Sequence, residues 1–111
     1  MALARQLRRH GVDVESLATW RSGAYRTVAD PHVLAAAHAD SRVLVTCDLE
    51  TIPTLLGELA EAGQHHTGVV LVSAYTYRPD DVGGLLRALS QLVSEQGDED
   101  WTDRVHYLKR V

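Results

Sequence analysis

The chain has 111 residues, a hydrophobic content of 45% and a formal net charge of −4, from 15 acidic side chains against 11 Lys and Arg. This length indicates one domain with a single core, and the apolar content excludes a disordered chain. The acidic balance argues against a generic nucleic-acid coat, because phosphate binding depends on Lys and Arg, but it leaves room for a local basic rim around an acidic site.

The single cysteine excludes an internal disulfide framework and fits a reducing cytoplasm. The N-terminus MALARQLRRH has no long apolar region, so no signal peptide is expected. No run approaches the ~20 apolar residues of a membrane span.

The apolar pattern predicts alternating helices and strands. A helix over 3–10 stops at Gly11, and VDVE at 12–15 is expected to form a short strand with one wet face. No clear period marks 16–29. Asp30 then predicts a helix start, because Asp is a preferred N-cap and the next residue is a proline.

From there the alternation is regular. Helices are expected over 30–39, 51–63 and 80–94, and strands over 42–47, 68–73 and 105–108. Such alternation predicts βαβ units. We therefore expect an α/β fold of three layers, with a mainly parallel central sheet and helices on both faces, in one domain spanning 1–111.

The stretch RVLVTCDLE at 42–50 carries the strongest functional signal. Its aliphatic run VLV at 43–45 predicts a strand covered on both faces. Asp48 falls where this strand should end, which is where ligands bind in open α/β sheets, and Glu50 follows. The alternative is that Asp48 only forms a turn or caps the next helix.

The acids are expected to converge. In a parallel sheet, helix N-termini lie on the same side as strand C-termini, so Asp30, Asp48 and Glu50 should meet at one edge. Converging carboxylates stay ionised together only beside a cation, and hard oxygen ligands suit Mg²⁺ or Mn²⁺. Two such ions about 4 Å apart can activate water and stabilise the leaving oxygen of a phosphodiester.

The run DPHVLAAAHADSRVLVTCDLE at 30–50 resembles the second half of PIN-like domains, which have an Asp, an Ala-rich helix, a short gap and a strand ending in T-x-D-x-D-F. The segments QHHTGVVLV at 64–72 and LARQLRRHGVDV at 3–14 resemble other parts of these domains. The resemblance covers nearly the whole chain. It implies a metal-dependent ribonuclease with RNA as its substrate, often the toxin of a toxin–antitoxin pair with an antitoxin protein as partner.

Carried over residue by residue, Asp30 matches the acid at the helix start and Asp48 the first Asp after the Thr. Glu50 falls where a second Asp is usual. The resemblance therefore implies Asp30, Asp48 and Glu50 as ligands of Mg²⁺ or Mn²⁺, with a metal-activated water as nucleophile. Thr46 matches the Thr, whose hydroxyl would orient an acid.

Two departures from the PIN-like pattern affect this expectation. Thr51 and Ile52 replace the aromatic residue after the second acid, and the first strand with its leading Asp has no counterpart, so an N-terminally shortened domain is expected. The chain is then either a shortened enzyme or a catalytically degenerate module for protein–protein or RNA binding. A third alternative is that a partner chain completes its site. A homo-oligomer is also expected, because a missing strand leaves a sheet edge for another copy to cover.

Trp20, Arg21, Tyr25 and Arg26 form an aromatic and basic segment. These residues could stack on and clamp single-stranded RNA. An ordinary surface loop is the favoured alternative.

His65 and His66 are adjacent, and we favour a plain loop role, because they lack a spaced third ligand. For Cys47 we expect a buried, inert thiol, since no base is defined beside it.

Overall fold

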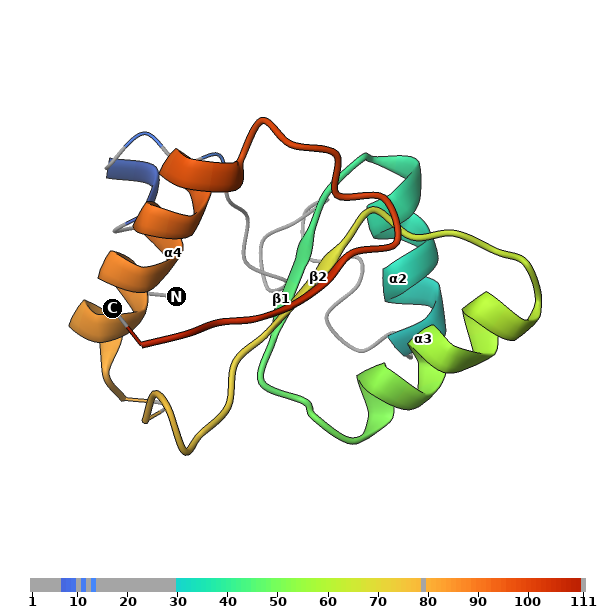
Figure 1. Cartoon of the computed structure of the whole chain (residues 1–111), viewed down its shortest axis with the longest axis horizontal. Helices are drawn as coiled ribbons and strands as arrows, with labels where there is room; N and C mark the ends of the chain where they lie inside the picture. The colour runs from blue at the N-terminus through green and yellow to red at the C-terminus, as the bar shows by residue number, and fades with distance from the viewer. Residues whose placement is uncertain (1–6, 10, 12, 14–29, 79, 111) are drawn as a thin grey trace. The chain divides into compact units, whose positions relative to one another are not determined.

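A computed structural model describes residues 7–9, 11, 13, 30–78 and 80–110 (Figure 1). The elements in chain order are α2 (Asp30–Ala39), β1 (Leu44–Thr46), α3 (Thr51–Glu61), β2 (Val69–Leu71), α4 (Val82–Gln96) and β3 (Val105–Tyr107). They fall into two compact units. Unit 2 holds α2, β1, α3, β2 and β3, whereas unit 1 holds the helical residues 7–9 and α4.

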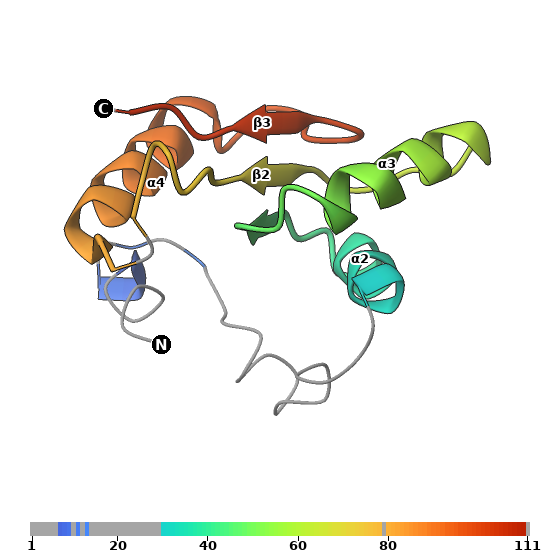
Figure 2. The ribbon, with the colours of Figure 1, turned by 90° about the horizontal axis from the view of Figure 1, so that it is seen from below.

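Among the described residues of unit 2, the sheet has three parallel strands in the order β1-β2-β3, and their arrows point the same way in Figure 2. Val69 of β2 pairs with Leu44 on one side and Val105 on the other. The prediction of an α/β fold with a parallel sheet is therefore confirmed. The helix predicted over 30–39 has these bounds. The strands predicted over 42–47 and 68–73 are shorter at both ends, whereas β3 begins at 105 as predicted and ends one residue earlier.

Helices α2 and α3 pack on the sheet through one cluster of aliphatic side chains. Leu34 of α2 meets Ile52 and Leu56 of α3, and all three pack against Val69 and Leu71, neither of which has any exposed surface. Val69 and Leu71 point the same way because side chains alternate along a strand. The two helices therefore cover one face of the sheet.

Strand β1 is less buried than the sequence predicts. Its residues alternate between half-buried and exposed, and Val45 keeps 45% of its surface exposed, while all of β2 is buried. The prediction that the aliphatic run at 43–45 is covered on both faces is therefore wrong. The reason is its place among the described strands: β2 lies between β1 and β3, so β1 has a described neighbour on one side only.

In unit 1, helix α4 buries a stripe of residues three or four apart: Leu85, Ala88, Leu89 and Leu92. Its start is capped by Asp81, whose Oδ1 accepts the N–H of Gly84 at 2.9 Å. The helix predicted over 80–94 is thus confirmed, displaced by two residues. None of the helices in the described part of the chain is both long and apolar enough to cross a membrane.

The C-terminal residues of unit 1 are tied to the turn before α4. The buried Tyr77 donates its hydroxyl hydrogen to the carbonyl of Lys109 at 2.9 Å, and the guanidinium of Arg110 lies 5.7 Å from the centre of the Tyr77 ring. Arg110 also donates to the carbonyl of Thr76. The polar tip of Tyr77 is therefore satisfied although its ring is buried.

Candidate functional site

The acids selected from the sequence lie at one end of unit 2. Helix α2 runs antiparallel to β1 (Figure 1). The first residue of α2 therefore lies at the end of the sheet where β1 ends and α3 begins. Thr46 is the last residue of β1, Asp48 lies in the link, and Glu50 is the residue before α3. Asp30 is the first residue of α2, and its side chain lies outside the described part of the structure.

Asp48 is held in place by main-chain hydrogen bonds. Its Oδ1 accepts the N–H of Thr51 at 2.9 Å and the N–H of Glu50 at 3.0 Å. The N–H of Asp48 in turn donates to Oγ1 of Thr46 at 3.1 Å. The first N–H groups of a helix have no partner within it, and the Asp48 side chain satisfies that of Thr51, the first residue of α3, although the N-cap residue itself is Glu50. Asp48 therefore stabilises the start of α3, the structural role that the alternative interpretation of this residue predicts.

The same contacts set the charge of the site. The N–H of Thr51, then that of Glu50 and the side chain of Thr51, lower the pKa of the Asp48 carboxyl below its ordinary value of 3.8. Asp48 is therefore ionised at neutral pH. A carboxylate has about four lone-pair positions, so the cap leaves acceptor capacity for a further ligand.

The donor atoms at this end suit a hard cation. Mg²⁺ is usually held by one or two carboxylates, waters and substrate phosphates. Asp48 and the exposed Glu50 supply carboxylate oxygens of this kind from one short link. Among the described residues, no group of three or more His, Cys, Asp or Glu side chains is arranged to hold a metal ion.

The remaining site predictions have different outcomes. Trp20, Arg21, Tyr25 and Arg26, the predicted RNA-binding residues, lie outside the described residues. Cys47 is exposed, so the expected burial of its thiol is wrong. The physical reason is that it follows an edge strand whose odd-numbered residues point away from the helices.

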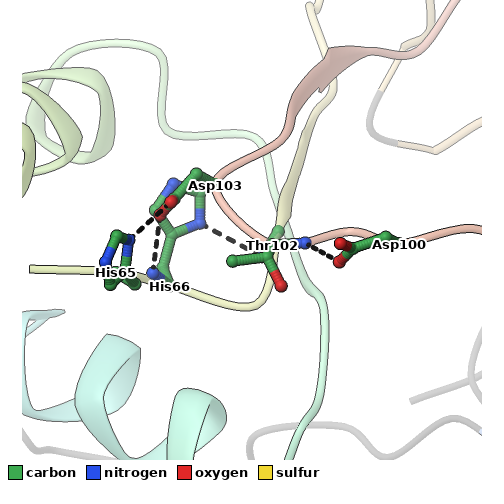
Figure 3. Close-up of polar contacts among 6 residues, drawn as sticks. His65, His66, Asp100, Thr102 and Asp103 are labelled. Carbon is green, nitrogen blue, oxygen red and sulfur yellow. Dashed lines mark hydrogen bonds and ion pairs between the residues drawn. The ribbon is translucent and has the colours of Figure 1, made fainter.

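A second polar cluster, at the start of β2 and β3, connects segments far apart in the sequence (Figure 3). Nδ1 of His65 lies 2.6 Å from Oδ2 of Asp103, and the N–H of His66 donates to Oδ1 of Asp103 at 3.1 Å. The N–H of Asp103 in turn donates to the carbonyl oxygen of His66. Because the strands are parallel, this cluster lies at the opposite end of the sheet from Asp48.

His66 is the buried member of this cluster, with 6% of its surface exposed. Its Nδ1 accepts the N–H of Gly68 at 3.1 Å, so the neutral ring carries its hydrogen on Nε2. Burial is the main reason that the pKa of His66 lies below its ordinary value. All these contacts join loop to loop, in agreement with the loop role favoured for His65 and His66.

A groove of about 670 Å³ also opens between α2 and α3. Its walls are mainly aliphatic, from residues such as Leu34, Leu55 and Leu59, with His38 and Glu58 among its polar members. A volume of this size can hold a small molecule. Among its described lining residues, no hydrogen bond or ion pair joins Glu58 to His38 or His65, and His65 is bound to Asp103 instead. We therefore regard the acidic end of the sheet as the better candidate site.

Comparison with known proteins identifies no relative: no family model, no curated protein and no solved structure matches the chain.

Proposed function

We propose that the chain is a PIN-like ribonuclease that depends on Mg²⁺ or Mn²⁺, with Asp30, Asp48 and Glu50 holding the cation. The observation that carries the proposal is the ionised Asp48, fixed by main-chain N–H groups where β1 ends and α3 begins. The order and spacing of the acids and of Thr46, which resemble the PIN-like pattern, support it.

Each residue has a distinct role. A divalent cation at this end would polarise a phosphodiester and increase the acidity of water. Asp48 is already oriented by the N–H groups of Thr51 and Glu50, so binding a ligand costs it little rotational freedom. Thr46 accepts the N–H of Asp48 and is a positioning residue. Without a cation the acids would repel RNA, whose phosphates are negatively charged.

The resemblance extends the proposal to the toxin component of a toxin–antitoxin pair. Expression of the chain in a bacterium should then arrest growth, and Asp48→Asn should relieve the arrest at equal protein levels. Unimpaired growth with folded wild-type protein would contradict the toxin assignment while leaving the ribonuclease proposal to its own test.

A catalytically degenerate module for protein–protein or RNA binding is the second candidate. Its supporting observation is that Asp48 binds the N–H groups at the start of α3, a structural role that requires no catalysis. The ribonuclease needs the negative charge of Asp48 to hold the cation. The binding module needs only an oxygen at this position that accepts hydrogen bonds.

The test is cleavage of mixed single-stranded RNA with Mg²⁺ or Mn²⁺, compared with an EDTA control. Asp48→Asn keeps an oxygen that can accept the N–H groups of Glu50 and Thr51, so the cap and the fold should persist. It removes the charge, and we expect the cleavage rate to fall about 100-fold. Glu50→Gln should have the same direction of effect.

Asp100→Asn is the matched control. Asp100 also accepts a main-chain N–H, that of Thr102 at 2.9 Å, and its pKa is also lowered by this contact, but it precedes β3 at the other end of the sheet. This variant should cleave like the wild type. If folded wild-type protein does not cleave RNA with either metal, or if Asp48→Asn cleaves equally well, the binding module becomes the function.

A further inference from the structure

The outer edge of β1 presents main-chain hydrogen-bonding groups. Hydrogen bonds flank the ladder of β1 and β2 at both ends: Leu44 N–H donates to the carbonyl of Gly68 at 3.1 Å, and Val72 N–H donates to the carbonyl of Thr46 at 2.9 Å. Because main-chain groups alternate along a strand, those of the odd-numbered residues in 43–47 face away from β2. In the described part of the chain, the order β1-β2-β3 places no strand on that side.

The side chains of the same residues are exposed and apolar. Val43 has 37% and Val45 45% of its surface exposed, and Cys47 is also exposed. Leu44 packs into the core under α2 and α3, so the odd-numbered residues lie on the opposite face. An exposed apolar edge strand is a template for pairing with another strand.

We propose that this edge binds β1 of a second copy of the chain, antiparallel, about a two-fold axis at Val45. In this register Val45 faces Val45 of the partner subunit, and Val43 faces Cys47 of the partner subunit. Val45 is the middle residue of β1, and Val43 and Cys47 flank the strand. With β1 extended by one residue at each end, these residues present the outward main-chain groups that the hydrogen-bonded pairs of an antiparallel ladder require.

The charged residues beside β1 favour this register over the registers shifted by one residue. It places Arg42 opposite Asp48 of the partner subunit, and the two-fold axis repeats the ion pair. Arg42 has an interaction within its own chain, and its five donors can serve a second carboxylate. Shifting the axis to Leu44 would set Asp40 against the partner's Asp48, two like charges.

A shift of the axis in the other direction, to Thr46, fails for a different reason. It would require Glu50 to pair as a strand residue, but Glu50 is the N-cap of α3 and has a helical backbone, with φ −111° and ψ −61°. The two-fold axis at Val45 is therefore the register that joins opposite charges and centres the pairing on β1 without drawing in the start of α3.

A single substitution tests the register directly. Residues four apart in one extended strand are separated by about 13 Å, so Val43→Cys cannot form a disulfide with Cys47 of its own chain. Across the proposed interface the two positions form a hydrogen-bonded pair with Cα atoms about 5.5 Å apart, which suits a disulfide. Oxidised Val43→Cys should run as a covalent dimer that a reductant separates.

The controls use the same positions. The wild type, with Cys47 alone, and the double variant Val43→Cys/Cys47→Ser should stay monomeric on a non-reducing gel, because neither has two cysteines opposite each other. Cross-linking in the double variant, or none in Val43→Cys, would overturn the register.

Sedimentation of the protein without cross-links gives an independent measurement. The wild type should reach a dimer with rising concentration, and Val45→Lys should weaken that dimer about tenfold or more, because it places like charges on the two-fold axis. Val93→Lys is matched in exposure, 44% against 45%, but lies on α4 and should dimerise normally.

Two results of this measurement would overturn the proposal. A wild type that stays monomeric would exclude a second copy as the occupant of this edge. Open-ended species larger than a dimer would mean that β1 of one copy pairs with β3 of the next, since a two-fold pair closes at two. Neither result depends on whether the chain cleaves RNA.

Discussion

His66 and Asp103 bind each other in both directions: the N–H of His66 donates to Oδ1 of Asp103 at 3.1 Å, and the N–H of Asp103 donates to the carbonyl of His66 at 2.9 Å. Asp103 has a positive φ of 59°, a conformation that Asp tolerates better than most residues. This reciprocal contact connects the segment before β2 with the segment before β3.

The first prediction concerns Asp103. Its pKa is lowered, first by the hydrogen bond with His65 and then by the N–H of His66. A lowered carboxyl pKa contributes stability that is present above the ordinary value of 3.8 and is lost as the pH falls through the folded-state value. Asp103→Ala should lower the midpoint of thermal unfolding at neutral pH, and the difference from wild type should shrink below pH ~4.

Thermal unfolding followed by circular dichroism at neutral and acid pH measures this effect. Asp98→Ala, which removes an exposed acid outside this cluster, should leave the midpoint close to that of the wild type. Equal midpoints for Asp103→Ala and wild type at neutral pH would show that the contact adds no stability.

The second prediction concerns the buried ring of His66. Its pKa is lowered mainly by burial; Asp103 opposes this shift, whereas His38 and His65 add to it. The unfolded chain therefore binds a proton more readily than the folded chain, so stability is complete above the ordinary value of 6.5 and falls as the pH drops toward the folded-state value. His66→Asn should remove this part of the pH dependence.

Urea unfolding at a series of pH values measures this dependence. Asn offers an oxygen that can accept the N–H of Gly68, so the variant can keep the local hydrogen bond. His32→Asn, at an exposed position of α2, should follow the wild-type profile. A His66→Asn profile that still falls below pH ~6.5 as the wild type does would contradict the prediction.

The third prediction concerns Gly68, which lies against Trp101. Gly68 has φ +104°, and a Cβ atom there would lie 2.9 Å from the carbonyl oxygen of Trp101 and 3.0 Å from its Cε3. Gly68→Ala should therefore add steric overlap to backbone strain and lower the free energy of unfolding by about 3 kcal/mol. The fluorescence of Trp101 should change as its ring moves.

Gly63→Ala is the matched variant. Gly63 also has a positive φ, +70°, but a Cβ atom there would meet nothing within 4 Å. It should lose about 1 kcal/mol from strain alone. Equal losses in the two variants would show that Trp101 moves aside at no cost.

The acidic end of the sheet was largely predictable, because it depends on neighbours in the sequence. Asp48, Glu50 and Thr46 lie within five consecutive residues, and a strand followed by a helix places them in one link. Local chemistry also explains why the cap was foreseen as an alternative, since Asp is a preferred capping residue. The pairing of His65 with Asp103 was not predictable, because the two residues are 38 positions apart.

The sequence by itself determined which segments form helices and strands, because periodicity and helix-start residues act over a few positions, as in the helix from Asp30 to Ala39. Only the tertiary structure decided which strand is central. The aliphatic runs of β1 and β2 look alike, yet β2 is fully buried and Val45 is exposed, because burial depends on strand order rather than on composition. The exposed edge of β1 is thus a property of the assembled sheet.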